Sequence, residues 1–430
     1  MRKVKTNKNR KVFLATAGIV TLLASCTGTS GSSDEDQHAE LGILSAEGSA
    51  GYEFLTSIGE EVSEEHPEYS YEYTFVNTKV RPQIEQRWRA GDAPDSDYFV
   101  FNAQVPSTYD FVDNLVELTP YLEEEIAQGV TWGETFLDAT EPFTNLDGEI
   151  YGVPTDSHLI ALYYNKKLFD DHGLTPPKTW EELLEVSAAL SSENVEPIAL
   201  TGVYEPYMGF WIDNLFQREV GYEKAHEAAY TGDYDDDGFL RAAMKLQELR
   251  DQEAFMSGFE GVDFTAAQME FFQGNAGMIL MGTWLTSEMA DSIPEDFELG
   301  VVGFPVIPGG DGSPTAQLAH TNIMTINKDT EALDAVLAYA RAVTSEEAQT
   351  VRAKEYNSVP SVENAPAPDV PGLQELLDNT DEMNLRYFGL EFSPDRNEAY
   401  YHEVAKFFMG QYDAEEFISS LAKTMEAFAE

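Results

Sequence analysis

The chain has 430 residues, of which 43% are hydrophobic and 12% aromatic, so it can fold around substantial apolar cores. It holds 26 basic and 77 acidic residues, a formal net charge of −51, which disfavours nucleic acid and anionic lipid headgroups as partners. We interpret this charge as adaptation to a saline or alkaline exterior, with a cation-binding function as the alternative.

The N-terminal 38 residues carry an export pattern. Basic residues between Arg2 and Lys11 precede an apolar stretch, Val12 to Ala24, which is shorter than the ~20 helical residues that cross a bilayer but suits a signal peptide. Leu23-Ala24-Ser25-Cys26 resembles the bacterial lipobox, and Cys26 is the chain's one cysteine. We expect a signal peptide over 1–25, a lipidated Cys26 with a flexible tether over 26–38, and a location on the extracellular face of the cell membrane. An ordinary secretory signal with a chance cysteine is the alternative.

The first ordered elements alternate between strand and helix. A strand is predicted within Ala39–Gly48, and Leu55, Ile58 and Val62 then recur at helical spacing. Alternating aromatic residues predict a strand over 71–75, a helix pattern follows to residue 88, and a further strand is expected within 94–103. Strand–helix–strand order with short connections indicates an α/β fold with mostly parallel strands.

The later part of the chain continues this alternation. Strands are predicted over 160–165, 197–202 and 277–284. Thr179 and Glu182 form a capping box that predicts a helix start, and Thr344 and Glu347 form a second such pair. No internal repeat is evident.

Sequence motifs for phosphate binding and for nucleophilic catalysis are absent. The sequence has no phosphate-binding loop and no nucleophile elbow, and we expect no cofactor and no metal. Asp233, Asp235 and Asp237 alternate as in the first half of a calcium loop, but Arg241 and Met244 occupy later ligand positions. We therefore predict a solvated helix start at this segment, with a weak calcium site as the alternative.

Two long motifs carry a family resemblance. "DGEIYGVPTDSHLIALYYNKKLFDDHGLTPPKTWEELLEVSAAL" (147–190) and "FFQGNAGMILMGTW" (271–284) resemble extracellular solute-binding proteins of family 1, the sugar-binding lipoproteins that are similar to maltose-binding protein and serve ABC importers. The resemblance implies a periplasmic-binding-protein-like α/β fold with two lobes, a ligand cleft between them and a hinge that the chain crosses several times. It places 39–155 and 303–350 in one lobe, and 156–302 and 351–430 in the other.

The resemblance implies that the protein binds a ligand and does not catalyse a reaction. We expect a monomeric, lipid-anchored receptor that takes a mono-, di- or oligosaccharide and delivers it to the permease subunits of an ABC transporter. A surface glycoside hydrolase is the alternative from another class, and it would need two carboxylates about 5 to 10 Å apart in the cleft. A receptor for a polyamine or a peptide is the alternative among binding proteins.

A sugar site needs carboxylates or amides beside flat aromatic rings. The stretch "YEPYMGFW" (204–211) offers both, and Glu205 with Tyr207 is similar to the Glu-Pro-Tyr with which family members hold sugars. Trp284 matches the stacking tryptophan of the family. Trp211 is either a ligand contact or a core residue.

Six further residues are expected near the ligand from their places in the family pattern: Glu47, Phe101, Asn102, Asp156, His158 and His320. His158 stands where maltose-binding members have a ligand-binding glutamate, so Asp156 is expected to supply the missing carboxylate. His320 replaces a glycine of many relatives, and we expect it to be a ligand contact or a packing residue.

Overall fold

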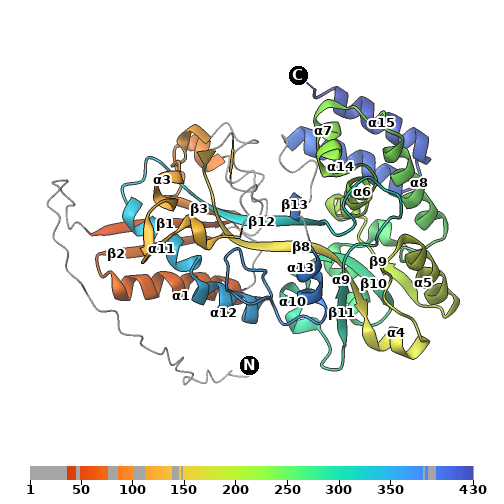
Figure 1. Cartoon of the computed structure of the whole chain (residues 1–430), viewed down its shortest axis with the longest axis horizontal. Helices are drawn as coiled ribbons and strands as arrows, with labels where there is room; N and C mark the ends of the chain where they lie inside the picture. The colour runs from red at the N-terminus through yellow and green to blue at the C-terminus, as the bar shows by residue number, and fades with distance from the viewer. Residues whose placement is uncertain are drawn as a thin grey trace. The chain divides into compact units, whose positions relative to one another are not determined.

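The computed structural model describes residues 36–44, 49–75, 86–99, 112–137, 145–146, 149–380, 383–385 and 394–429. Within these ranges one mixed sheet of nine strands has the order β2-β1-β3-β12-β8-β10-β9, with β11 paired to β8 and β13 to β12 (Figure 1). Its strands are β1 (Gln37–Leu44), β2 (Tyr69–Phe75), β3 (Ser96–Phe99), β8 (Val153–Asn165), β9 (Glu196–Ala199), β10 (Ala276–Gly282), β11 (Leu299–Val302), β12 (Gln317–Ile326) and β13 (Met383–Leu385). Two hairpins pair β4 (Glu125–Ala127) with β5 (Val130–Thr131) and β6 (Asn145–Leu146) with β7 (Glu149–Ile150).

Helices flank these strands. Their bounds are α1 (Ser49–Glu65), α3 (Thr119–Leu122), α4 (Lys166–His172), α5 (Trp180–Ser192), α6 (Glu205–Val220), α7 (Tyr222–Thr231), α8 (Asp237–Asp251), α9 (Phe264–Phe272), α10 (Leu285–Glu288), α11 (Leu333–Val343), α12 (Glu346–Tyr356), α13 (Leu373–Asn379), α14 (Pro394–Phe408) and α15 (Ala414–Glu426). None of the described helices is long and apolar enough to cross a membrane.

Buried apolar residues of the described chain fall into two clusters. The first core combines β1, α1, α11 and residues such as Trp132 and Val153. The second core begins at Leu159 and combines β8, α5, α6, α8, β10, α14 and α15. Each core has its own helices and shares β8 and β12 with the other core, and each is stabilised by burial of its own apolar surface.

The strands β8 and β12 pass from one core to the other, lying side by side (Figure 1). Val153 belongs to the first core and Leu159 to the second, while Ala319 and Met324 mark the reverse passage on β12. Between these points β8 carries only buried polar residues after Pro154: Thr155, Asp156, Ser157 and His158. Buried polar groups require hydrogen-bond partners, so the passage between the cores is the place to look for a side-chain network.

Most of the predicted elements are present. The strands expected near residues 41, 73, 97, 162, 198 and 280 form β1, β2, β3, β8, β9 and β10, and the capping box of Thr179 and Glu182 starts α5. The expected helix start at Thr344 is wrong by one residue, because Ser345 is the N-cap of α12 and its hydroxyl accepts a hydrogen bond from the backbone N–H of Ala348. The segment 233–237 is a helix start, as predicted, with Asp236 as the N-cap of α8.

One expectation about the architecture differs from the structure. The strands are not mostly parallel, because β8 runs antiparallel to β10, β11 and β12. The lobe bounds implied by the resemblance stay an expectation. Within 303–350, Phe304 and Leu318 pack in the second core, and within 351–430, Tyr356 packs on the first core. The change from one core to the other therefore falls within β12 and after α12.

Candidate functional site

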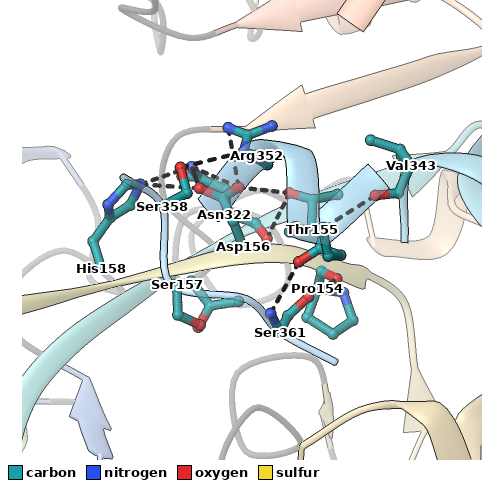
Figure 2. A network of polar contacts seen from close by, with 12 residues as sticks. Pro154, Thr155, Asp156, Ser157, His158, Asn322, Val343, Arg352, Ser358 and Ser361 are labelled. Atoms are coloured by element: carbon teal, nitrogen blue, oxygen red, sulfur yellow. Dashed lines mark hydrogen bonds and ion pairs between the residues drawn. The ribbon is translucent and has the colours of Figure 1, made fainter. Parts of the chain in front are cut away.

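Asp156 is the centre of a polar network at the passage between the cores (Figure 2). Its side chain is 0% exposed, and its oxygens lie 3.3 Å from Nη2 of Arg352 and 3.0 Å from Nε2 of His158. The amide nitrogen of Asn322 donates to both oxygens at 3.2 Å, and the hydroxyl of Thr155 shares its proton between Oδ1 at 3.2 Å and the carbonyl of Asn322 at 3.0 Å. Four donors therefore compensate the desolvation of this carboxylate.

Arg352 brings the third passage of the chain into this network. It lies on α12, its guanidinium is 5.9 Å from the ring centroid of Phe54 in the first core, and its Nε donates to the hydroxyl of Ser358 at 3.3 Å. The hydroxyl of Ser361 donates to the carbonyl of Pro154 at 2.7 Å. The network thus ties β8, β12 and the chain after α12 together.

His158 connects this network to an aromatic group. The 3.0 Å separation of Nε2 from Asp156 favours a proton on Nε2, so in the neutral ring Nδ1 accepts from the hydroxyl of Thr283 at 3.1 Å. The imidazole stands edge-on to the indole of Trp284, with 5.5 Å between ring centroids and 81° between planes. Asp156 is itself fully buried, and it therefore fixes the orientation of the imidazole from inside the protein.

Trp284 is the middle of the aromatic group. It lies two residues after the end of β10, and its ring lies across Gly282, where any larger side chain would collide with it. The rings of Tyr207 and Phe210, from the first two turns of α6, lie 6.5 Å and 6.3 Å from the indole. Trp284 and Tyr207 are only partly buried. Flat, partly exposed rings next to an oriented imidazole can take the C–H face of a ligand.

The group extends along the start of α6. Tyr204 is exposed and lies 4.9 Å from Tyr207, and Phe264 at the start of α9 lies 6.0 Å from each of them. Glu205 is the first residue of α6, where a carboxylate is favoured by the helix dipole, and it lies 3.5 Å from Nδ1 of His402. A partly exposed carboxylate thus stands two residues from the Tyr207 ring.

The predicted residues fall into three sets: those in the group just described, those whose side chains the structure does not describe, and two that are fully buried. Glu205, Tyr207, Trp284 and His158 belong to the group just described. Cys26, Glu47, Phe101 and Asn102 lie outside the described residues, and for His320 only the backbone is described, opposite that of His158.

Two of the predicted residues are buried away from solvent. Asp156 is fully buried with its oxygens engaged, and its carboxylate contacts His158 rather than the surface. Trp211 is also 0% exposed and packs edge-on against Phe255 and Phe304 in the second core. We leave Asp156 and Trp211 out of the proposed ligand contacts.

Sequence reasoning missed the partners that come from distant segments. Thr283, Asn322 and Arg352 complete the polar network, and Tyr204 and Phe264 extend the aromatic group. Tyr204 was within the quoted "YEPYMGFW" stretch and could have been found there. Among the described residues no group of three or more histidine, cysteine or acidic side chains is placed to hold a metal ion.

Comparison with known proteins finds similar sequences and structures among solute-binding proteins. The chain is 26% identical over 325 residues to a "Probable sugar-binding periplasmic protein" of Rhizobium meliloti, covering 71% of this chain and 74% of the relative. It is 24% identical over 233 residues to the "Diacetylchitobiose binding protein NgcE" of Streptomyces coelicolor, covering 51% and 47%. The solved structure of a "Chitin oligosaccharide binding protein" superposes with a TM-score of 0.76 at 23% identity, covering 92% of this chain and 99% of that one.

The fold and the family follow from these matches. The superposition confirms the predicted α/β periplasmic-binding-protein fold over about nine tenths of the chain. The sequence pattern of the bacterial extracellular solute-binding proteins matches residues 67–375, which is more than half of the chain. This match supports the expectation of a binding protein over that of an enzyme. The chain belongs to the bacterial extracellular solute-binding protein family.

Proposed function

We propose that the protein is the substrate-binding component of an ABC importer, and that it captures a mono-, di- or oligosaccharide and delivers it to membrane permeases. The observation that carries this proposal is the partly exposed aromatic group of Trp284, Tyr207 and Tyr204 beside the imidazole of His158 and the carboxylate of Glu205. A pyranose presents C–H faces to rings and hydroxyls to polar groups, and this arrangement suits both.

The network around Asp156 suits a receptor whose lobes move. We propose that the two cores are the two lobes and that β8, β12 and the chain after α12 are the hinge crossings between them. The ion pair of Asp156 with Arg352 then fixes β8 to the chain of α12 within the hinge. His158, which is oriented by Asp156, then faces the ligand. The relatives named above bind sugar or chito-oligosaccharides according to their names, which supports a carbohydrate over a polyamine or a peptide.

The test is calorimetry of the purified full-length chain against a panel of sugars, chito-oligosaccharides, spermidine and a tripeptide, with product analysis of each mixture. The proposal expects saturable heat with at least one carbohydrate and no change in that carbohydrate. Release of new reducing ends would indicate a glycoside hydrolase, and heat with spermidine or the peptide alone would indicate a non-sugar receptor.

We also propose that a lipid on Cys26 anchors the protein at the extracellular face of the membrane. The support is the sequence alone, in which Cys26 follows a short apolar stretch and precedes a polar tether. Cys26→Ser should leave export intact and release the protein into the medium. Retention of this variant in salt-washed membranes would overturn the anchor.

A further inference from the structure

One edge of β8 changes its partner strand part-way along. Leu159 is opposite Ala319 of β12, whereas Leu162 is opposite Val302 of β11. On the other edge, Ile160 and Ala161 pair with β10 without a break. The connection between β11 and β12 leaves the sheet at this point, which opens space beside β8.

A pocket of ≈ 470 Å³ lies beside this change of partner. Its apolar surface comes from residues such as Tyr164, Phe304 and Leu376, and its further walls are the segments 176–178, 314–317 and 371–379. This volume is within the range of small-molecule sites. Tyr164 follows His158 by six residues on the same strand, about 20 Å at ~3.3 Å per residue, and the pocket shares no lining residue with the candidate site.

Gln317 gives the pocket a buried polar group. It is 2% exposed, its Nε2 donates to the carbonyl of Thr315 at 3.0 Å, and its Oε1 has no hydrogen-bond partner among the described residues. Gly303 lies against this amide, where a Cβ atom would come within 3.1 Å of Nε2. A buried acceptor without a partner is costly, and a ligand hydroxyl at this position would satisfy it.

Two lysines give the pocket a charge that is rare on this chain. Lys166 and Lys178 line it, and no ion pair or hydrogen bond of either ammonium group is present in the described part of the chain. Glu375 is the acidic residue of the described lining. Since acidic residues outnumber basic ones 77 to 26 in the chain, a lining with two lysines and one glutamate is a local excess of positive charge, which favours an anion over a cation.

We propose that this pocket is a second binding site, which takes a small hydroxylated carboxylate of the size of a hexuronate. The ligand carboxylate pairs with Lys166 and Lys178, a hydroxyl donates to Oε1 of Gln317, and the carbon face of the ligand lies on Tyr164. A neutral hexose can make the hydroxyl and face contacts but gains nothing from the two ammonium groups. The inference does not depend on the proposed function of the Trp284 site.

The test is titration of the purified full-length chain with sodium D-glucuronate, using D-glucose as the neutral comparison. We expect saturable binding of glucuronate that is at least about tenfold tighter than that of glucose. Lys166→Gln combined with Lys178→Gln should weaken it by at least about tenfold, since two charged contacts are lost. Lys167→Gln is the matched control, because Lys167 is the next residue but pairs with Asp171 at 2.6 Å outside the pocket. This control should bind glucuronate like the wild type.

Two further variants make the outcome decisive. Gln317→Ala should weaken glucuronate binding, with circular dichroism confirming the fold, whereas Trp284→Ala should leave it unchanged. Absence of glucuronate binding, equal binding of glucose, or unchanged affinity in the double lysine variant would each overturn the proposal. Loss of glucuronate binding in Trp284→Ala would assign the ligand to the other site and would overturn it as well.

Discussion

The imidazole of His158 stands edge-on to the indole of Trp284, with 5.5 Å between ring centroids and an interplanar angle of 81°. Asp156 holds the other side of the imidazole at 3.0 Å. A residue that is fully buried at the passage between the cores is therefore linked through a single histidine to the partly exposed ring that we propose as the ligand platform. His158 therefore connects the proposed ligand platform to the proposed hinge.

Trp284→Ala should weaken binding of the identified carbohydrate by about ten- to a hundredfold, because it removes the apolar platform for the sugar ring. The change in intrinsic fluorescence on binding should also be smaller, since Trp132, Trp180 and Trp211 are fully buried and Trp88 is the other partly exposed tryptophan of the described chain. Calorimetry and fluorescence titration measure the two effects.

Met244→Ala is the control for this variant, because Met244 is an exposed apolar residue on α8. It should bind with wild-type affinity. Trp180→Phe is a poorer control, since Trp180 is 2% exposed at the start of α5 and its replacement would leave a void. Unchanged affinity in Trp284→Ala would show that the ligand binds elsewhere.

Asp156→Asn should lower the free energy of unfolding by about 3 kcal/mol, because it leaves the buried guanidinium of Arg352 without its carboxylate. Combining it with Arg352→Met should cost less than the sum of the two single changes, since no unpaired charge then remains buried. Urea unfolding followed by circular dichroism measures these differences.

Asp171→Asn is the matched control, because Asp171 forms an exposed ion pair with Lys167 on α4. Exposed ion pairs contribute little to stability, because water and salt screen them. If Asp156→Asn unfolds at the same urea concentration as Asp171→Asn, the network around Asp156 contributes little to stability.

The elements that could be predicted from the sequence are those with local causes. The alternation of Tyr71 and Tyr73, and the capping box of Thr179 with Glu182, act over a few residues and form β2 and α5 as expected. The pairing of β8 with β12 joins segments more than 150 residues apart, and no local pattern encodes it. For the same reason Arg352 could not be assigned to Asp156.

The family motif named residues that the structure brings close together, whereas the burial of a residue could not be predicted from the motif. The motif placed Trp284 and Tyr207 together, and their rings lie 6.5 Å apart. Trp211 could not be separated from them by periodicity, because every residue of α6 from Met208 to Val220 is buried and the helix has no solvent-exposed face there. Only the packing against Phe255 and Phe304 distinguishes it.

Thermal stability should rise with ionic strength. The formal net charge of −51 produces repulsion over the surface, and at 1 M salt the screening length falls to about 3 Å. The melting temperature should therefore increase from dilute buffer to molar sodium chloride, and potassium chloride should act equally. A flat or falling curve would show that the acidic groups are already compensated, and a response to one cation alone would indicate specific cation binding.

Asp97 on β3 is a buried carboxylate in an unfavourable site. Burial raises its pKa to about 7, although Arg87 and a hydrogen bond from Nε1 of Trp88 at 3.2 Å lower it, and Glu40 raises it further. The folded protein therefore keeps this proton to a higher pH than the unfolded chain, where the pKa is 3.8. Stability from this group is complete below about pH 4 and is lost as the pH rises towards 7.

Asp97→Asn removes this titration, because the amide is neutral at every pH and can still accept the hydrogen bond from Trp88. The variant and the wild type should have similar free energies of unfolding near pH 4. Above pH 7 the variant should be more stable by up to roughly 4 kcal/mol, which corresponds to a shift of about three pKa units. Asp296→Asn, at an exposed position, should follow the wild-type curve in parallel. Urea unfolding at intervals between pH 4 and 8 measures the three curves, and a constant offset between Asp97→Asn and the wild type would mean that Asp97 is ionised in the folded protein throughout this range.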